Sequence, residues 1–91
     1  MGYSWSAEES PATLTDDDTG EVVGKVEFRR GEGVLLLDHL WVEPARRGQG
    51  LARRVVDHFA ADARLRDQKI RPLCGVARRM MEGDPRYEDV L

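Results

Sequence analysis

Residues 42–56 read Val42-Glu-Pro-Ala-Arg-Arg-Gly-Gln-Gly-Leu-Ala-Arg-Arg-Val-Val56, and this stretch decides how the rest of the chain is interpreted. An apolar run ends at Glu43-Pro44, and a helical pattern begins only after Gly50, so a glycine-bearing turn joins a strand to a helix. The glycines permit a tight turn and leave no Cβ atoms to keep a ligand away. The first amides of a helix lack internal partners and lie at the positive end of the helix dipole. The turn is therefore a candidate phosphate site, to which Arg46 and Arg47 add charge.

Composition narrows the class of protein. A chain of 91 residues has room for one domain, and its net charge of -3 argues against a nucleic-acid partner or an anionic membrane. No apolar run approaches the roughly 18 residues that a membrane helix needs, and no signal-peptide pattern opens the chain, so we expect a cytoplasmic protein. The lone cysteine, Cys74, excludes an internal disulfide, and His39 and His58 have no partners at metal-ligand spacing. We expect no metal.

The beginning of the chain shows little periodicity. Residues 1–11 are expected to form a loose N-terminal segment, followed by one domain over residues 12–91. A short strand is expected over 12–15, and the acidic run Asp16-Asp17-Asp18-Thr19-Gly20 is typical of a turn.

Two longer strands are expected next, joined by a hairpin at residues 30–33. Residues 21–30 alternate between apolar and polar side chains, which predicts a half-buried strand. Residues 34–42 place apolar side chains on both faces, which predicts a central strand. Strict alternation assigns the side chains of this strand to two faces: Leu36, Leu40 and Val42 on one, and Leu35, Leu37 and Trp41 on the other.

The second half of the chain is predicted to be mainly helical. Apolar residues recur over 51–65 at helical spacing, and Arg53, Arg54, Asp57, His58 and Asp62 are expected to face water. A strand is expected over 68–73, interrupted by Pro72, and a short helix over 74–81. A final turn is expected over 84–89, with Asp84 as its cap and Pro85 in its first position.

Two side chains could carry chemistry. Cys74 opens the short second helix, and a helix N-terminus lowers the pKa of a thiol, which is the condition for nucleophilicity. The alternative is a small buried apolar residue. His39 lies in an otherwise apolar strand, expected on the face of Leu37 and Trp41. It is either a core histidine bonded to a backbone carbonyl or a proton acceptor near neutral pH.

The string Arg47-Gly48-Gln49-Gly50-Leu51-Ala52 has the form Arg/Gln-x-x-Gly-x-Gly/Ala, and it resembles the acetyl-CoA pyrophosphate loop of the GNAT superfamily of N-acetyltransferases. Asp38-His39 before the loop, Pro72-Leu73-Cys74 after the helix and the Pro85-x-Tyr87 ending resemble the minimal, single-domain members of that superfamily. The resemblance covers about residues 20–91. The polar residue usual after the histidine is replaced by Leu40, and residues 75–80 are more basic than in that subgroup.

The resemblance implies an α+β, truncated GNAT (acyl-CoA N-acyltransferase) fold. Its sheet is expected to be mostly antiparallel, with one long helix, short C-terminal helices and a strand that splays away to admit the coenzyme. It also implies a coenzyme site. The amides of Gly48, Gln49, Gly50, Leu51 and Ala52, with Arg47, are expected to hold the pyrophosphate of acetyl-CoA. Backbone groups of Leu40, Trp41 and Val42 are expected to pair with the pantetheine amides.

The resemblance implies an N-acetyltransferase that transfers an acetyl group from acetyl-CoA to an amine, and two chemical routes stay open. In a plant relative, the cysteine that matches Cys74 is proposed as the acetyl-accepting nucleophile, for which His39 would be the base. In the usual superfamily route, the amine attacks directly and Cys74 only lines the pocket. The acceptor is an unidentified small amine or protein lysine. A non-catalytic CoA-binding or protein-interaction module is the alternative function, because so short a chain has little material for an acceptor pocket unless a homodimer completes it. The chain is either a monomer or a homodimer.

Overall fold

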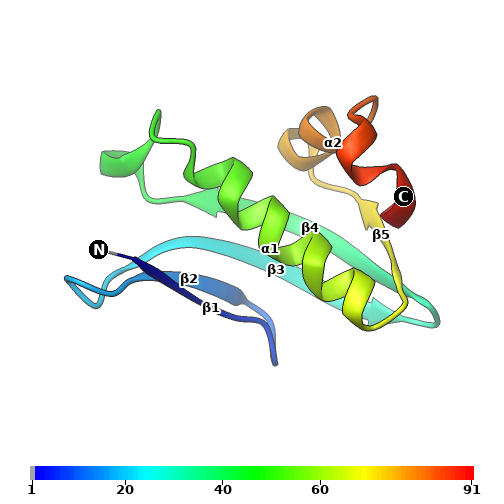
Figure 1. Cartoon of the computed structure of the whole chain (residues 1–91), viewed down its shortest axis with the longest axis horizontal. Coiled ribbons are helices and arrows are strands. Elements are labelled where there is room, and N and C mark those ends of the chain that lie inside the picture. The colour runs from blue at the N-terminus through cyan, green and yellow to red at the C-terminus, as the bar shows by residue number, and fades with distance from the viewer. Residues whose placement is uncertain (1) are drawn as a thin grey trace.

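The computed structural model describes residues 2–91 of the chain as one curved sheet with its helices packed on one face (Figure 1). The sheet has five strands in the order β1-β2-β3-β4-β5; all neighbours are antiparallel except β4 and β5, which are parallel. The strands are β1 (Tyr3–Ser6), β2 (Ala12–Asp16), β3 (Val22–Gly31), β4 (Val34–Val42) and β5 (Lys69–Pro72). The helices are the single-turn η1 (Pro44–Arg46), the long α1 (Leu51–Leu65), the short α2 (Gly75–Met81) and the 3-10 helix η2 (Pro85–Val90). The predicted α+β class is confirmed.

Residues 3–6 form strand β1, so the expectation that residues 1–11 are loose is wrong for these residues. Strand β1 pairs with β2 from Tyr3↔Asp16 to Ser6↔Thr13. Its Trp5 indole Nε1 donates to Asp62 Oδ2 at 2.6 Å and stacks on His58, with ring centroids 5.2 Å apart. His58 and Asp62 were expected to face water and are instead covered by β1. These contacts join residues far apart in the sequence, so local periodicity in the first residues gave no sign of them.

Strand β4 contains a bulge, which overturns the predicted assignment of its two faces. The pairing with β3 runs Phe28↔Leu37 and then Glu27↔His39, so Asp38 is the extra residue. Leu35 and Leu37 before the bulge, and Leu40 and Val42 after it, are therefore all buried on the face towards α1. Strict alternation had placed these two pairs on opposite faces. The bulge likewise separates His39 from the face of Leu37, because a one-residue shift turns every later side chain over.

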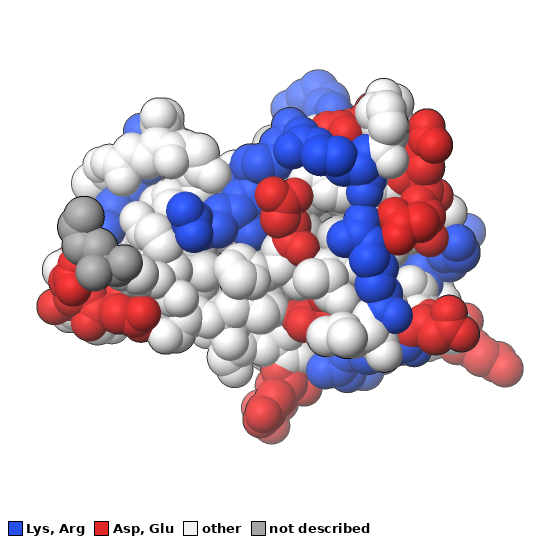
Figure 2. Space-filling model, in the orientation of Figure 1, with Lys and Arg blue, Asp and Glu red and all other residues white. Residues whose placement is uncertain are grey.

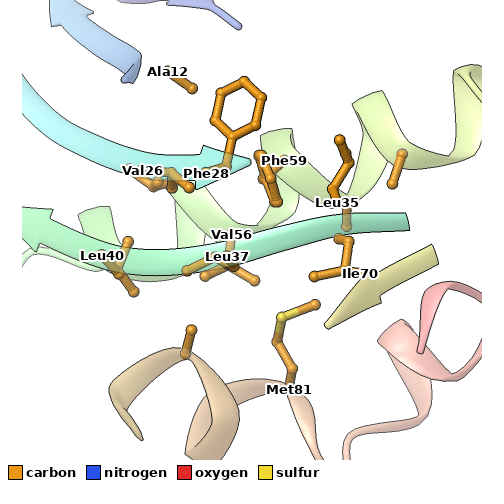
Figure 3. Close-up of a cluster of buried hydrophobic side chains, with 14 of the residues drawn as sticks. Ala12, Val26, Phe28, Leu35, Leu37, Leu40, Val56, Phe59, Ile70 and Met81 are labelled. Carbon is orange, nitrogen blue, oxygen red and sulfur yellow. The ribbon is translucent and has the colours of Figure 1, made fainter. Parts of the chain in front are cut away.

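Helix α1 buries the apolar stripe that its sequence predicts. Its buried residues are Leu51, Val55, Val56, Phe59, Ala60 and Ala63. Phe59 meets Phe28 of β3 edge-on, with ring centroids 5.4 Å apart (Figure 3). Burying a side chain of this size contributes about 1.5–3 kcal/mol. Met81 of α2 points into the same cluster, towards Leu37 and Ile70 (Figure 3). The core therefore fixes both helices to the central strands.

The pairing of β5 with β4 stops half-way along β4. It extends from Val34↔Lys69 to Leu37↔Pro72, after which the amides of Leu73 and Cys74 both donate to the carbonyl of Leu37, at 2.9 and 3.2 Å. The chain then turns into α2, while β4 continues to Val42 without β5 beside it. This is the splayed strand that the resemblance implies, and it opens the molecule next to Cys74. Among residues 2–91, no helix is long and apolar enough to cross a membrane.

Candidate functional site

A cleft of about 360 Å³ lies where β4 continues beyond the end of its pairing with β5. One wall is the end of β4, another is the loop that precedes α1 with the first turn of that helix, and the third is α2. Figure 1 shows the loop and α2 rising on either side of the end of β4. The lining residues are Leu40, Val42, Arg47, Gly48, Gly50, Leu51, Ala52 and Val76. The cleft is mainly apolar, with backbone amides and one arginine at its loop end.

The loop at the end of the cleft presents free backbone amides. Gly48 and Gly50 have φ angles of 86° and 77°, in the left-handed region that favours glycine, and Gly50 is the N-cap of α1. The first helical hydrogen bond runs from the amide of Arg54 to the carbonyl of Gly50, at 3.1 Å. Within the described chain, the amides of residues 48–53 donate to no other part of the protein. Such a set of amides at the start of a long helix can bind an anion.

The arginines beside the loop have different partners. Arg46 donates to Asp16 of β2 at 2.5 Å, and this guanidinium holds the pKa of the largely buried Asp16 carboxyl below its ordinary value. The pair ties the loop to the N-terminal part of the sheet. Arg47 Nε instead donates to the carbonyl of Val42 at 3.2 Å, so its side chain crosses the cleft at the loop end.

Cys74 lies at the fork between β4 and β5 and is half-buried against the core. Burial raises the pKa of its thiol, but the amides of Ala77, Leu40 and Val76 around the sulfur, with the charge of Arg79, outweigh burial and lower that pKa overall. None of these amides makes a regular capping hydrogen bond to the sulfur. The thiol therefore meets the electrostatic condition for a reactive cysteine.

Comparisons with known proteins decide the family. The family model described as GCN5-related N-acetyl-transferase matches residues 12–90, most of the chain. The chain belongs to the GCN5-related N-acetyltransferase family. The solution structure of a "GCN5-like putative N-acetyltransferase" from Staphylococcus aureus superimposes with a TM-score of 0.75, at 24% sequence identity, over 96% of this chain and 85% of that one. At this identity, the likeness establishes the shared fold. No curated protein matches the sequence.

The structure brings together most of the residues that the GCN5-related loop motif singled out, but not all of them. Leu40, Val42 and the motif from Arg47 to Ala52 line the cleft, with the exception of Gln49. Gln49 lies on the other side of the loop, in a hollow beside Tyr3. The Trp41 ring makes a cation–π contact with Lys25, whose Nζ lies 5.1 Å from the ring centroid. The Trp41 side chain does not line the cleft, so only the backbone of Trp41 could meet a coenzyme.

His39 does not lie with the cleft residues of this family member. Its side chain is exposed and its backbone pairs with Glu27 of β3, on the sheet face away from α1. In residues 2–91, no hydrogen bond joins His39 to Cys74. No group of three or more His, Cys, Asp or Glu side chains in the described part of the chain could hold a metal ion.

Sequence reasoning missed the network that holds the α2 wall in place. Arg53 Nη1 donates to Tyr87 Oη at 2.9 Å, and to the Met80 carbonyl and Asp84 Oδ2 at 3.3 Å each. The buried Tyr87 Oη in turn donates to Asp57 Oδ1. These bonds fix η2 and the end of α2 against α1. The Pro85-x-Tyr87 motif was the available signal, but nothing local to it shows that Arg53 and Asp57 are its partners.

Proposed function

We propose that this chain is an N-acetyltransferase that binds acetyl-CoA in the cleft between β4 and α2. The observation that carries the proposal is the continuity of the cleft. It runs from the free amides of the loop along the part of β4 that has no β5 beside it. Cys74 does not line the cleft, but the amides of two lining residues, Leu40 and Val76, lie beside its sulfur. A pyrophosphate at the loop and an extended amide-bearing arm along the strand fit these groups in that order. Membership of the family supports the choice of coenzyme.

The coenzyme would be held by backbone groups and one side chain. The amides from Gly48 to Ala52 would donate to the pyrophosphate, and Arg47 would add its charge. On the side of β4 that β5 leaves uncovered, the backbone of Leu40 to Val42 would pair with the pantetheine amides as an added strand does. Arg47 now donates to the Val42 carbonyl. Coenzyme binding would therefore exchange this bond for one from pantetheine and release Arg47 towards the phosphates.

Cys74 could take part in the transfer in two steps, in which it is first acetylated and then gives the acetyl group to the amine. Its thiolate would attack the acetyl carbonyl, forming the new S–C bond while the bond to the CoA sulfur breaks and CoA leaves as a thiolate. The acceptor amine would then attack the acetyl group on Cys74 and lose a proton as the thiolate leaves. His39 is exposed on the opposite sheet face, so it would take the proton of an acceptor that approaches from that face. In direct transfer, the amine attacks acetyl-CoA and Cys74 only lines the site.

A CoA-binding module without turnover is the second candidate function, and one observation favours it. The residues that line the cleft include no histidine, aspartate or glutamate. No proton acceptor of the usual kind therefore stands inside the cleft itself. A homodimer could supply one from a second copy, and sedimentation that shows a strict monomer would remove that variant.

Intact-protein mass spectrometry after incubation with acetyl-CoA, beside calorimetric titration of the same sample, separates these possibilities. Binding with a single acetyl adduct that is lost in Cys74→Ala supports the covalent route. Binding without an adduct, but with transfer to an amine, supports direct transfer, and binding with neither supports the module. Absence of binding contradicts the proposed function in every form.

A further inference from the structure

Two arginine pairs flank the glycine loop, Arg46-Arg47 before it and Arg53-Arg54 after it, and three of these side chains already have polar partners in the protein. Arg46 pairs with Asp16, Arg47 donates to the Val42 carbonyl, and Arg53 donates to the Tyr87 hydroxyl. In residues 2–91, Arg54 makes no ion pair and no side-chain hydrogen bond. Arg47 also lacks an ion pair, but its side chain is held at the cleft by the Val42 carbonyl. Of the four arginines, Arg54 is therefore the one that has neither an ionic nor a hydrogen-bonding partner among the described residues.

Arg54 is nevertheless held in a defined place. Its guanidinium carbon lies 4.9 Å from the centroid of the Tyr3 ring, in a cation–π contact that restricts the side chain without neutralising its charge. Figure 2 shows basic side chains across the middle of this face, with acidic side chains among them and at both ends. Strand β1, which carries Tyr3, thus positions a free cation at the first turn of α1.

Arg54 borders two open hollows outside the cleft. One, of about 440 Å³, runs along the outer side of α1 from the loop and is lined by Gly50, Arg53, Arg54, Asp57, His58 and Ala61. The other, of about 480 Å³, lies between the loop and β1 and is lined by Gly2, Tyr3, Asp16, Asp18, Arg46, Gln49 and Arg54. In the first, the Asp57 carboxylate accepts from Tyr87; in the second, Asp16 is paired with Arg46. Asp57 keeps its negative charge, because Tyr87 is a neutral donor, but Arg53 and Arg54 outnumber it in the first hollow. In the second hollow Asp16 and Asp18 offset Arg46 and Arg54, so the first is the better phosphate site.

We propose that Arg54 binds the 3′-phosphate of coenzyme A and makes the protein select CoA over 3′-dephospho-CoA. The inference rests on the proposed function and adds a specificity-determining residue to it. With the pantetheine arm in the cleft and the pyrophosphate on the loop amides, the adenosine end would extend past Gly50, which lines both the cleft and the first hollow. Arg54 stands there, beside Gly50, with its charge unpaired. A phosphate monoester carries enough charge for an exposed arginine to discriminate its presence.

Calorimetric titration of three proteins with CoA and with 3′-dephospho-CoA tests the proposal. The proteins are the wild type, Arg54→Ala and the control Arg66→Ala, which removes an exposed arginine at the other end of α1. We expect the wild type and the control to bind CoA about two- to fivefold more tightly than 3′-dephospho-CoA, because an exposed ion pair contributes up to about 1 kcal/mol. In Arg54→Ala the two ligands should bind equally, at the wild-type affinity for 3′-dephospho-CoA. The discrimination should shrink as salt rises, because the site is exposed.

Each contrary result has its own meaning. Equal binding of the two ligands by the wild type, or undiminished discrimination by Arg54→Ala, overturns the role of Arg54 and leaves the proposed function intact. Equal weakening of both ligands in Arg54→Ala also overturns it, because Arg54 would then act on the pyrophosphate or on the fold. If neither ligand binds the wild type, the proposed function fails first. A Tyr3→Leu variant provides a second readout and should lose part of the discrimination while keeping its affinity for 3′-dephospho-CoA.

Discussion

Gly50 and Gly20 are a matched pair of left-handed glycines, one in the cleft and the other in the β2–β3 turn. Their φ angles are 77° and 75°, and a Cβ atom added to either would have nothing within 4 Å. Alanine at either position therefore meets the same backbone strain and no steric clash. The two substitutions should have the same effect on stability, but only the one at Gly50 should weaken coenzyme binding.

The expected magnitudes follow from this geometry. A left-handed alanine costs about 1–2 kcal/mol, which lowers the Tm of a domain of this size by roughly 4–16 °C. At Gly50 the new methyl group also enters the space in front of the loop amides and keeps phosphate oxygens away. Losing even one charge-assisted hydrogen bond of about 1.5–3 kcal/mol raises the Kd at least about tenfold. Gly20→Ala should keep the wild-type Kd.

Circular dichroism melts establish that both variants are folded at the titration temperature, and calorimetry with acetyl-CoA then gives the two Kd values. Unchanged affinity in a folded Gly50→Ala protein would show that the loop is not the coenzyme site. Equal weakening in Gly20→Ala would show that lost stability, rather than the added methyl group, explains the effect. Either result refutes the assignment of the loop.

Three further predictions concern the residues around the cleft. Arg86 beside Asp84 lowers the pKa of that carboxyl from 3.8 to about 2. The ionised carboxylate therefore stabilises the folded protein above pH 4, and this contribution is lost as the pH falls towards 2. Urea unfolding of Asp84→Asn should show a weaker pH dependence over this range than the wild type. Tyr87→Phe removes a buried hydroxyl that donates to Asp57 and accepts from Arg53. The substitution should lower the free energy of unfolding, measured with denaturant, by about 1–3 kcal/mol. An unfolding midpoint equal to that of the wild type would contradict the role of this network. Because the pKa of Cys74 is lowered, alkylation by iodoacetamide should be half-maximal at a lower pH than for a cysteine peptide, and an equal or higher midpoint would show that burial dominates.

The elements that depend on local pattern could be predicted from the sequence. The apolar stripe from Leu51 to Ala63 has helical periodicity, so the long helix was located correctly. The glycines before it supply the left-handed backbone that a tight turn needs, so the loop was located correctly as well. Pro72, which was expected to interrupt the last strand, is the residue at which the pairing of β5 with β4 ends. The same local signals placed most of the residues that line the cleft.

Features that depend on contacts between distant residues could not be predicted. The bulge at Asp38 is a matter of register between β3 and β4, and Asp38 also makes a bidentate ion pair with Arg29 across these strands. One extra residue moved His39 to the uncovered face, away from the position that alternation assigned to it. Docking of Trp5 on His58 joins the first strand to the long helix, and neither segment contains a sign of the other.

The central claim is that acetyl-CoA lies along the free amides of the loop and the end of β4 that has no β5 beside it. Titration of ¹⁵N-labelled protein with acetyl-CoA, followed by amide chemical shifts, tests it most directly because the proposed ligands are backbone groups. The account predicts that the largest shifts occur at residues 48–53 and 40–42, with smaller changes at Arg54 and around Cys74. Saturable shifts confined to other parts of the chain, or none at all, would contradict it.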